Sequence, residues 1–192
     1  MDESNKQHEK AKLKNIEAKP GQLERYDTCY ERDGISNIFL SIEPLTGKRW
    51  VNVFQRRTRV DWAKHIQELV EKHYIDAERI VLVVDNLNIH SKAALYELLE
   101  PAHAKKIADK LEIHYTPKHG SWLNIAEIEL SHLSRQCLKR RLEDKETVKK
   151  EVDAWMKERN KNSRVVNWRF TTADARIKLK KLYPVIQWMG QN

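Results

Sequence analysis

The hydrophobic residues of the chain follow the short period of strands in some segments and the longer period of helices in others. Residues 37–43 and 49–56 are strand-like, and a turn signal at 46–47 between them predicts an antiparallel hairpin. Residues 80–84 are a continuous run of Ile, Val and Leu, which predicts a central strand covered on both faces. Residues 111–115 alternate and predict a further strand.

Helical spacing occurs in several segments beside these strands. The predicted helices span residues 61–74, 91–100, 121–141, 143–160 and 172–182, with a turn or two more at 102–110. The residues expected to cap helices are Asp61, Ser91 and either Thr171 or Thr172. The hairpin followed by alternating helices and strands indicates an α/β fold.

The length and composition of the chain predict a single domain. It has 192 residues, 40% of them hydrophobic, with six tryptophans, which predicts a substantial core. No apolar run has the length of a membrane span, and the charged N-terminus is unlike a signal peptide. Cys29 and Cys137 have no metal-binding or redox spacing, which fits a reducing cytoplasm.

The net charge of +8 lies entirely in the last quarter of the chain. Residues 138–192 contain 15 Lys or Arg against 7 Asp or Glu, whereas residues 1–137 contain 21 of each kind. A basic segment of this kind suits contacts with the phosphates of DNA. The alternative is an ordinary solvated helical face.

The N-terminal region has a less regular pattern. Residues 6–22 are charged and follow no clear period, and a loop signal lies at 20–21. This stretch is expected to be a surface arm or a segment that becomes ordered on DNA. Residues 26–31 predict a short irregular strand, after which Gly34 is expected to break the chain.

Asp85 stands at the end of the 80–84 strand. In open α/β sheets, ligands bind outside the carboxyl ends of such strands, so Asp85 is a candidate site residue. The alternative is that Asp85 forms a turn or caps a helix.

Two glutamates lie near the start of the predicted helix 121–141. Glu127 and Glu129 are two positions apart and, at about 100° per residue, point in nearly opposite directions. One of them is therefore expected to face a site while the other points away. The alternative for both is a solvated helix face.

The segments around these carboxylates resemble a known family. Residues 83–90 (Val-Val-Asp-Asn-Leu-Asn-Ile-His) resemble the second-Asp motif of the DDE transposases of the mariner superfamily. Residues 116–127 (Thr-Pro-Lys-His-Gly-Ser-Trp-Leu-Asn-Ile-Ala-Glu) resemble the third motif of that family. Residues 25–34 and 166–176 extend the resemblance over nearly the whole chain, and the bacterial insertion-sequence branch is the most similar.

The resemblance implies an RNase H-like fold, a mixed sheet with flanking helices. In that family the first catalytic Asp ends the first strand and is followed directly by Glu, a position that Asp2 matches. The chain is therefore expected to be the C-terminal piece of a transposase that lacks most of the first strand and the upstream DNA-binding helices. The alternative is that Asp2 is a disordered terminal residue. The expected domains are a catalytic domain over 1–142 and a basic helical extension over 143–192 packed on it.

The resemblance also implies metal-dependent DNA strand cleavage and strand transfer, as in transposition and recombination. Asp2, Asp85 and Glu127 are the expected catalytic residues and the ligands of two Mg²⁺ ions, with Mn²⁺ as a substitute. The secondary candidates are Asn86, His90, His119 and Asn124. A His after a strand end, such as His90, more often caps a helix.

The expected partner is double-stranded DNA, both transposon ends and target, bound by a homodimer in the bacterial cytoplasm at the nucleoid, with no membrane. The expected DNA-binding residues are Lys118, Arg135, Lys139, Arg140 and Arg141. Two other functions remain open. The first is an inactive transposase remnant that only binds DNA or dimerises, and the second is a stand-alone RNase H-like nuclease.

Overall fold

The computed structural model describes residues 1–13, 16–25, 29–118, 120–162, 165–178 and 180. The strands are β1 (Asp2–Ala11), β2 (Tyr30–Glu43), β3 (Lys48–Phe54), β4 (Ile80–Val84) and β5 (Leu111–Tyr115). The α-helices are α1 (Arg59–Glu68), α2 (Ala93–Leu98), α3 (Pro101–Lys110), α4 (Ile125–Leu133), α5 (Lys145–Lys161) and α6 (Thr172–Lys178). Short π or 3-10 segments are η1 (Leu69–His73), η2 (Ser121–Leu123) and η3 (Ser134–Leu138).

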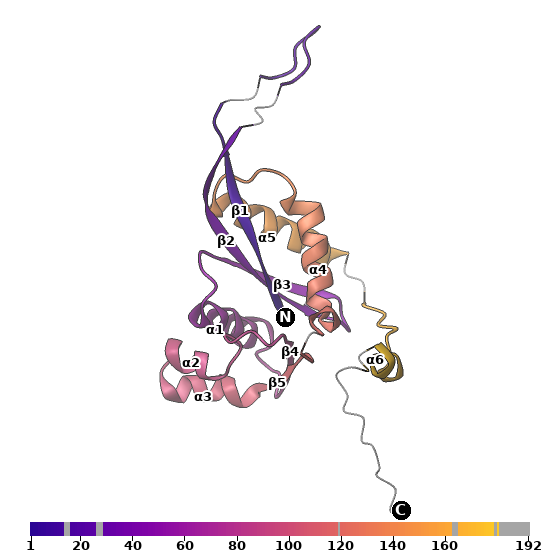
Figure 1. The fold of residues 1–192 in the computed structure, drawn as a ribbon. Coiled ribbons are helices and arrows are strands. Elements are labelled where there is room, and N and C mark those ends of the chain that lie inside the picture. The colour runs from indigo at the N-terminus through magenta and orange to yellow at the C-terminus, as the bar shows by residue number, and fades with distance from the viewer. Residues whose placement is uncertain (14–15, 26–28, 119, 163–164, 179, 181–192) are drawn as a thin grey trace, which may run out of the picture.

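The strands form an antiparallel sheet, β1-β2-β3, and a parallel pair, β4-β5. The backbone nitrogen of Met1 donates to the carbonyl of Val83 over 2.6 Å, which places the start of β1 beside β4. The predicted hairpin is confirmed, because Glu43 pairs with Lys48 across the turn that contains Gly47. The predicted α/β architecture is therefore present, as an antiparallel sheet and a parallel pair of strands with flanking helices (Figure 1).

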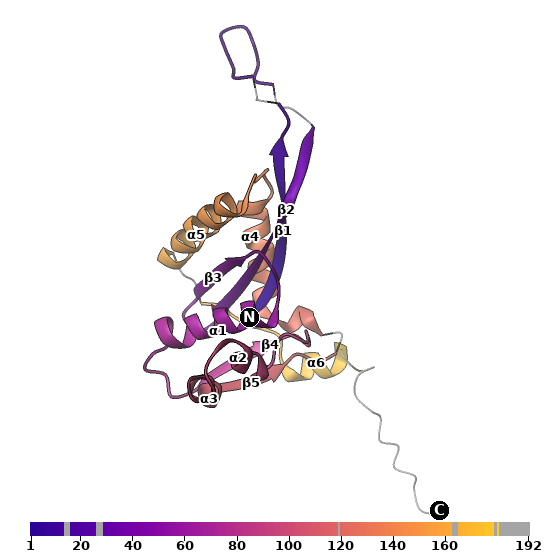
Figure 2. The same ribbon diagram turned by 90° about the vertical axis from the view of Figure 1, so that its left-hand side faces the viewer.

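Alternating side chains of the central strand β2 divide the core into two layers. Phe39 lies in a cluster with residues of α1, α2 and α3, whereas Ile38 and Leu40 lie in a second cluster with residues of α4 and α5. Figure 2 shows the first three helices gathered near β4 and β5, while α4 and α5 lie along the longer strands. The strand β2 thus lies between one layer formed by α1, α2 and α3 and another formed by α4 and α5.

The first strand differs from the sequence prediction. The sequence predicts that this strand ends at Asp2, but β1 spans the ten residues Asp2–Ala11 and so continues beyond that position. Its polar sequence has no apolar alternation, so pattern analysis does not detect it. Backbone pairing along β2 holds it instead, from Asp2 opposite Leu40 to Ala11 opposite Tyr30.

The predicted break at Gly34 is also wrong, because β2 runs through this residue. Asp33 and Gly34 together oppose His8, so β2 contains a bulge here, and Gly34 adopts the positive φ of 86° that glycine tolerates. The His8 ring contacts the Asp33 carbonyl and the Ser36 hydroxyl at 2.7 and 2.8 Å. Beyond the bulge the two strands project from the body as a surface arm (Figure 2), which is one of the two forms predicted for residues 6–22.

The β4 strand is covered on one face only, contrary to the prediction. Leu82 and Val84 are buried in the α1–α3 layer, whereas Val81 and Val83 are 60% and 44% exposed. The exposed valines border a groove of about 370 Å³ that Trp168 also lines. A continuous apolar run does not distinguish these two situations, because burial depends on what packs against each face.

Several helix boundaries differ from the predicted ones. Thr58, rather than Asp61, caps α1, and Asp61 completes a capping box by accepting from the Thr58 backbone. Lys92, rather than Ser91, is the N-cap of α2 and makes no side-chain cap bond, although the Ser91 hydroxyl accepts from the Ala93 backbone. Where the sequence predicts a turn or two after Pro101, a ten-residue helix begins with that proline.

Thr171 caps α6, as predicted, in a reciprocal arrangement with Asp174. The predicted extension of this helix beyond residue 180 lies outside the described residues. No helix in the described part of the chain has the length and apolar character needed to cross a membrane.

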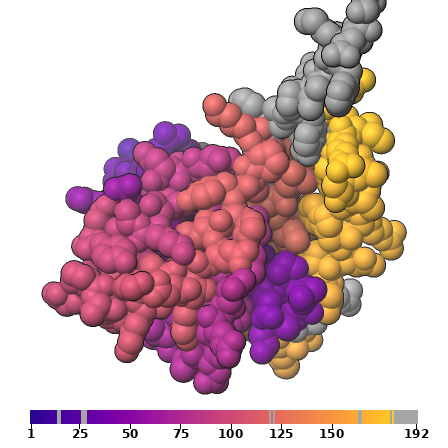
Figure 3. Space-filling model, turned by 90° about the horizontal axis from the view of Figure 1, so that it is seen from below, coloured from indigo at the N-terminus to yellow at the C-terminus, as the bar shows by residue number. Residues whose placement is uncertain are grey.

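The segment before α6 lies against the loop that precedes α4. The Phe170 and Trp122 rings meet edge to face with centroids 5.1 Å apart, and the Lys178 ammonium lies 4.5 Å above the Trp122 ring. The Val166 backbone donates to the Pro44 carbonyl at 2.9 Å. Seen from below, this C-terminal segment forms one flank of the molecule (Figure 3, yellow).

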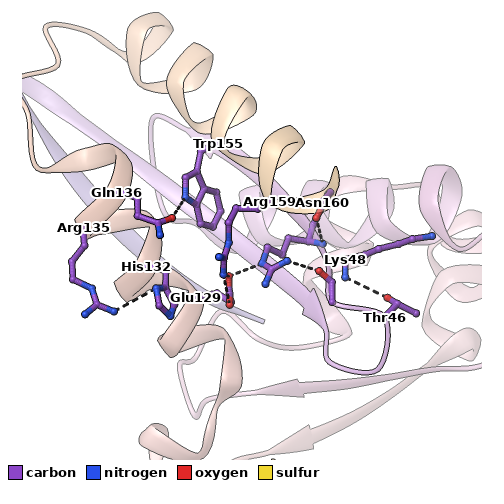
Figure 4. Close-up of polar contacts among 11 residues, drawn as sticks. Thr46, Lys48, Glu129, His132, Arg135, Gln136, Trp155, Arg159 and Asn160 are labelled. Carbon is purple, nitrogen blue, oxygen red and sulfur yellow. Dashed lines mark hydrogen bonds and ion pairs between the residues drawn. The ribbon is translucent and has the colours of Figure 1, made fainter. Parts of the chain in front are cut away.

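A buried ion pair joins α4, β3 and α5 (Figure 4). The Glu129 carboxylate accepts from Arg49 at 2.5 Å and from Arg159 at 3.1 Å. Asn160 holds the Arg49 backbone from α5, donating to its carbonyl at 2.7 Å and accepting from its nitrogen at 2.9 Å. Burial alone would raise the pKa of Glu129, but the two arginines lower it below its ordinary value.

We expect Glu129→Gln to lower the free energy of unfolding by about 3–5 kcal/mol, because it leaves the buried Arg49 charge without a counter-charge. Urea denaturation of the purified chain measures this change. Glu97→Gln is the matched control, since the Arg59–Glu97 pair has both side chains over 40% exposed. Its loss is expected to be below about 1 kcal/mol. Equal losses in the two variants would contradict the structural role of Glu129.

A second buried network centres on His65, a fully buried residue of α1 that contacts β2 and β3. Its Nδ1 donates to the Asn52 side-chain oxygen at 2.5 Å, so its Nε2 accepts from the Ser41 hydroxyl at 2.8 Å. The Asn52 amide nitrogen donates in turn to Glu68 at 2.9 Å. Burial, followed by the positive charges of the N-terminus and His73, lowers the pKa of His65 to about 3.

This lowered pKa predicts acid destabilisation. Between pH 6.5 and about 3 the unfolded chain binds a proton at His65 that the folded chain does not, so stability falls as the pH falls through this window. The contribution approaches about 1.4 kcal/mol per pH unit. His65→Gln retains one donor and one acceptor without titrating, and we expect a flatter curve of unfolding free energy against pH. An unchanged curve would contradict this role, and His114→Gln, with an exposed ring, is the control.

Candidate active site

The three carboxylates predicted from the sequence line one open cavity. This cavity has a volume of about 420 Å³ and lies where β1 starts, β4 ends and α4 begins. Its lining residues are Asp2, Glu3, Ser4, Asp85, Glu127, Leu130, Ser131 and Ser134. The fold therefore brings Asp2, Asp85 and Glu127 together from distant parts of the sequence.

Asp2 is held at the junction of three elements. The neighbouring Met1 is buried, and its carbonyl accepts from the Asn124 side chain at 2.8 Å while its nitrogen donates to Val83. The Met1 sulfur also accepts from the Trp62 indole at 3.2 Å. These contacts and the pairing with β2 contradict the alternative that Asp2 is a disordered terminal residue.

The negative charge of the Asp2 carboxylate is energetically unfavourable in this position. Burial raises its pKa to about 6, and the nearby charges of Glu3 and Asp85 act in the same direction. A hydrogen bond of 2.8 Å from the Glu3 backbone opposes the shift. The charged form of Asp2 is thus disfavoured both by burial and by the neighbouring carboxylates.

Asp85 follows the last residue of β4, as predicted. Its Oδ1 accepts from the Leu87 backbone at 3.1 Å and forms an ion pair with His90 Nδ1 at 3.0 Å, while the Asp85 carbonyl accepts from His90 Nδ1 at 3.2 Å. The next residue, Asn86, donates to the Thr116 carbonyl at 2.6 Å and so ties the ends of β4 and β5 together. Asn86 therefore has a structural contact that accounts for its place in the motif.

Glu127 lies in the first turn of α4, where its exposed side chain borders the cavity. The predicted helix 121–141 is divided here, because Asn124 adopts an extended conformation between η2 and α4 and caps α4 through Ala126. The same Asn124 side chain donates to Met1, so one residue links the helix that carries Glu127 to the strand that carries Asp2.

Glu3 is a site residue that the sequence analysis missed. Its buried carboxylate contacts His90 Nε2 at 2.6 Å, and the side chains of Glu3 and His90 are 1% and 0% exposed. Burial alone would lower the pKa of His90, but the bonds and charges of Glu3 and Asp85 raise it. The available signal was the position of Glu3 directly after Asp2 in the motif. Ligand atoms of Glu3, Asp85 and His90 lie within 4.8 Å of one another, close enough to hold a metal ion.

The predicted DNA-binding residues do not line the cavity. Lys118, Arg135, Lys139, Arg140 and Arg141 are exposed. Among them, Arg140 pairs with Glu151, and the Arg141 guanidinium lies 5.4 Å from the centre of the Tyr30 ring. His119 lies outside the described residues.

Comparison with known proteins identifies a family. Residues 1–149 match the model of a family described as DDE superfamily endonuclease. No curated protein and no solved structure matches the chain. The match covers most of the chain and includes the three elements that border the acidic cavity. The chain therefore belongs to the DDE superfamily endonucleases, whose domain has an RNase H-like fold.

Proposed function

We propose that this chain is the catalytic domain of a transposase of the mariner superfamily, from its bacterial insertion-sequence branch. It would cleave DNA strands at transposon ends and transfer them to a target. The observation that carries the proposal is the cavity where Asp2, Asp85 and Glu127 converge from β1, β4 and α4. The family match supports DNA cleavage in general, and the two motifs resembling that branch support the narrower assignment.

The residues present fit a divalent metal centre. Carboxylate oxygens are hard ligands that suit Mg²⁺ and Mn²⁺, and a cation would neutralise the charge that Asp2, Asp85 and Glu127 concentrate in the cavity. When bound, two such ions activate a nucleophile and stabilise charge on both oxygens of the displacement. In this proposal, Asp2, Asp85 and Glu127 hold the ions, and Asn124 and His90 keep these ligands in position.

A basic path beside the cavity would position the DNA backbone. Ser134 lines the cavity, and Arg135 and Lys139 follow it along and just beyond η3. Among the ion pairs of the described residues, Arg140 has an acidic partner, whereas Arg135 and Lys139 have none. The catalytic domain over 1–142, the basic extension over 143–192, the homodimer and the nucleoid location belong to the same proposal.

Metal binding provides the first test. We expect Mn²⁺ to raise the melting temperature of the chain, because ligand bound to the folded state adds about 2.7 kcal/mol at 100 times the dissociation constant. Asp85→Asn and Glu127→Gln should lose most of this gain, since each removes a ligand charge. Asp109→Asn, on the exposed face of α3, should keep it.

Nicking of supercoiled plasmid by the same proteins tests the chemistry. The proposal is supported if the parent chain and the Asp109→Asn control nick the plasmid in the presence of metal while Asp85→Asn and Glu127→Gln do not. A melting temperature that Mn²⁺ leaves unchanged in the parent chain would contradict it. Metal binding without nicking would favour the inactive remnant, and cleavage confined to RNA–DNA hybrids would favour the stand-alone nuclease.

DNA affinity tests the basic path. We expect Arg135→Ala and Lys139→Ala to weaken binding to duplexes of any sequence, and each to reduce the slope of log affinity against log salt by about 1. Fluorescence anisotropy at several salt concentrations measures both quantities. Lys105→Ala is the control, because Lys105 already pairs with Asp109. An unchanged slope in the two variants would mean that the DNA backbone does not contact Arg135 or Lys139.

A further inference from the structure

The His90 ring has acceptors at both of its nitrogens. Nε2 lies 2.6 Å from the Glu3 carboxylate, and Nδ1 lies 3.0 Å from Asp85 Oδ1 and 3.2 Å from the Asp85 carbonyl. Because both neighbours of Nδ1 are oxygens that only accept, Nδ1 carries a hydrogen and donates it. Neither nitrogen then offers a free lone pair, so His90 acts on Asp85 as a donor rather than on a metal as a ligand.

The ring is also prevented from turning. It is fully buried and packs 5.9 Å from the Trp62 ring, centroid to centroid. Its backbone is held on both sides, since its nitrogen donates to Leu87 at 3.1 Å and its carbonyl accepts from the Tyr115 hydroxyl at 2.6 Å. Glu3 fixes the far end of the ring, so the Nδ1 donor has one available direction.

The consequence for Asp85 is a carboxylate with one oxygen occupied. The Leu87 backbone donates to Oδ1, and the His90 ring lies 3.0 Å from the same oxygen as an ion-pair partner while it donates to the Asp85 carbonyl, which leaves Oδ2 for an external ligand. The Asp85 side chain is 30% exposed and borders the acidic cavity. A carboxylate held in this way does not need to become ordered when a cation binds.

We propose that Glu3 and His90 are positioning residues that fix Asp85 for a divalent cation, with Glu3 acting through the His90 ring. The Asp2–Glu3 dipeptide then has two tasks, because successive strand residues point to opposite sides. Both residues border the cavity, but the buried Glu3 carboxylate contacts the His90 ring, through which it acts on Asp85. This inference rests on the proposed function, since it assigns a role toward the same metal site.

Two substitutions of His90 separate this role from simple core packing. The amide nitrogen of Asn superimposes on Nδ1 of His, and that of Gln on Nε2. His90→Asn therefore keeps the donor to Asp85 and loses the bond to Glu3, whereas His90→Gln keeps the bond to Glu3 and loses the donor. If the donor to Asp85 positions that residue, His90→Asn binds metal more tightly than His90→Gln. If only burial of the side chain matters, His90→Gln binds metal at least as tightly as His90→Asn.

The experiment measures Mn²⁺ dissociation constants by electron paramagnetic resonance of the free ion, on full-length chains with unchanged circular dichroism. We expect His90→Gln and Glu3→Ala to weaken Mn²⁺ binding by about 10–100-fold, as loss of partners behind metal ligands commonly does. His90→Asn and Glu3→Gln should stay closer to the parent chain. Combining Glu3→Ala with His90→Gln should add little, because both act on the same carboxylate.

His103→Gln is the matched control, because the His103–Glu71 pair repeats the Nε2–carboxylate contact on the exposed surface. It should bind Mn²⁺ as the parent does. Parental affinity in both His90→Gln and Glu3→Ala, with binding lost in Asp85→Asn, would overturn the inference and leave the proposed function standing. A parent chain that binds no Mn²⁺ would overturn both.

Discussion

The buried contact of Glu129 with Arg49 and Arg159 sets the rotation of α4, and the acidic cavity depends on that rotation. A charge this deeply buried is stable only beside its counter-charges, so the helix is not free to turn Glu129 toward water. Glu127 lies two residues earlier, about 200° around the helix axis. Fixing one glutamate in the core therefore turns the other toward Asp2 and Asp85.

The opposite orientation of Glu127 and Glu129 could be predicted, because it follows from helical geometry alone. The positions of Asp85 and Glu127 were also predictable, since each follows or begins a strongly patterned element. Which glutamate faces the cavity could not be derived from periodicity, because it depends on Arg49 and Arg159 in other elements. The family resemblance supplied that choice, and the structure supplies its physical cause.

Other features were missed because they have no local pattern. The strand β1 is polar and is stabilised by backbone pairing with β2 rather than by apolar alternation. Glu3 and His90 are 87 residues apart in the sequence, and a buried carboxylate looks the same as an exposed one until its partner is known. The exposure of Val81 and Val83 likewise depends on packing that a run of apolar residues does not record.

Glu129 on α4 and Asp2 at the start of β1 show how the chain meets opposite electrostatic demands in neighbouring parts of the structure. Glu129 is neutralised by arginines, which lowers its pKa and stabilises the fold. At the cavity, burial, together with the charges of Glu3 and Asp85, raises the pKa of Asp2, so the charge of this carboxylate is left for something outside the chain to neutralise. Such a cluster costs stability, and it persists because Asn124 and the buried Met1 hold the strand and helix together around it. The arrangement is the one expected where binding a cation, rather than folding, is the purpose of the carboxylates.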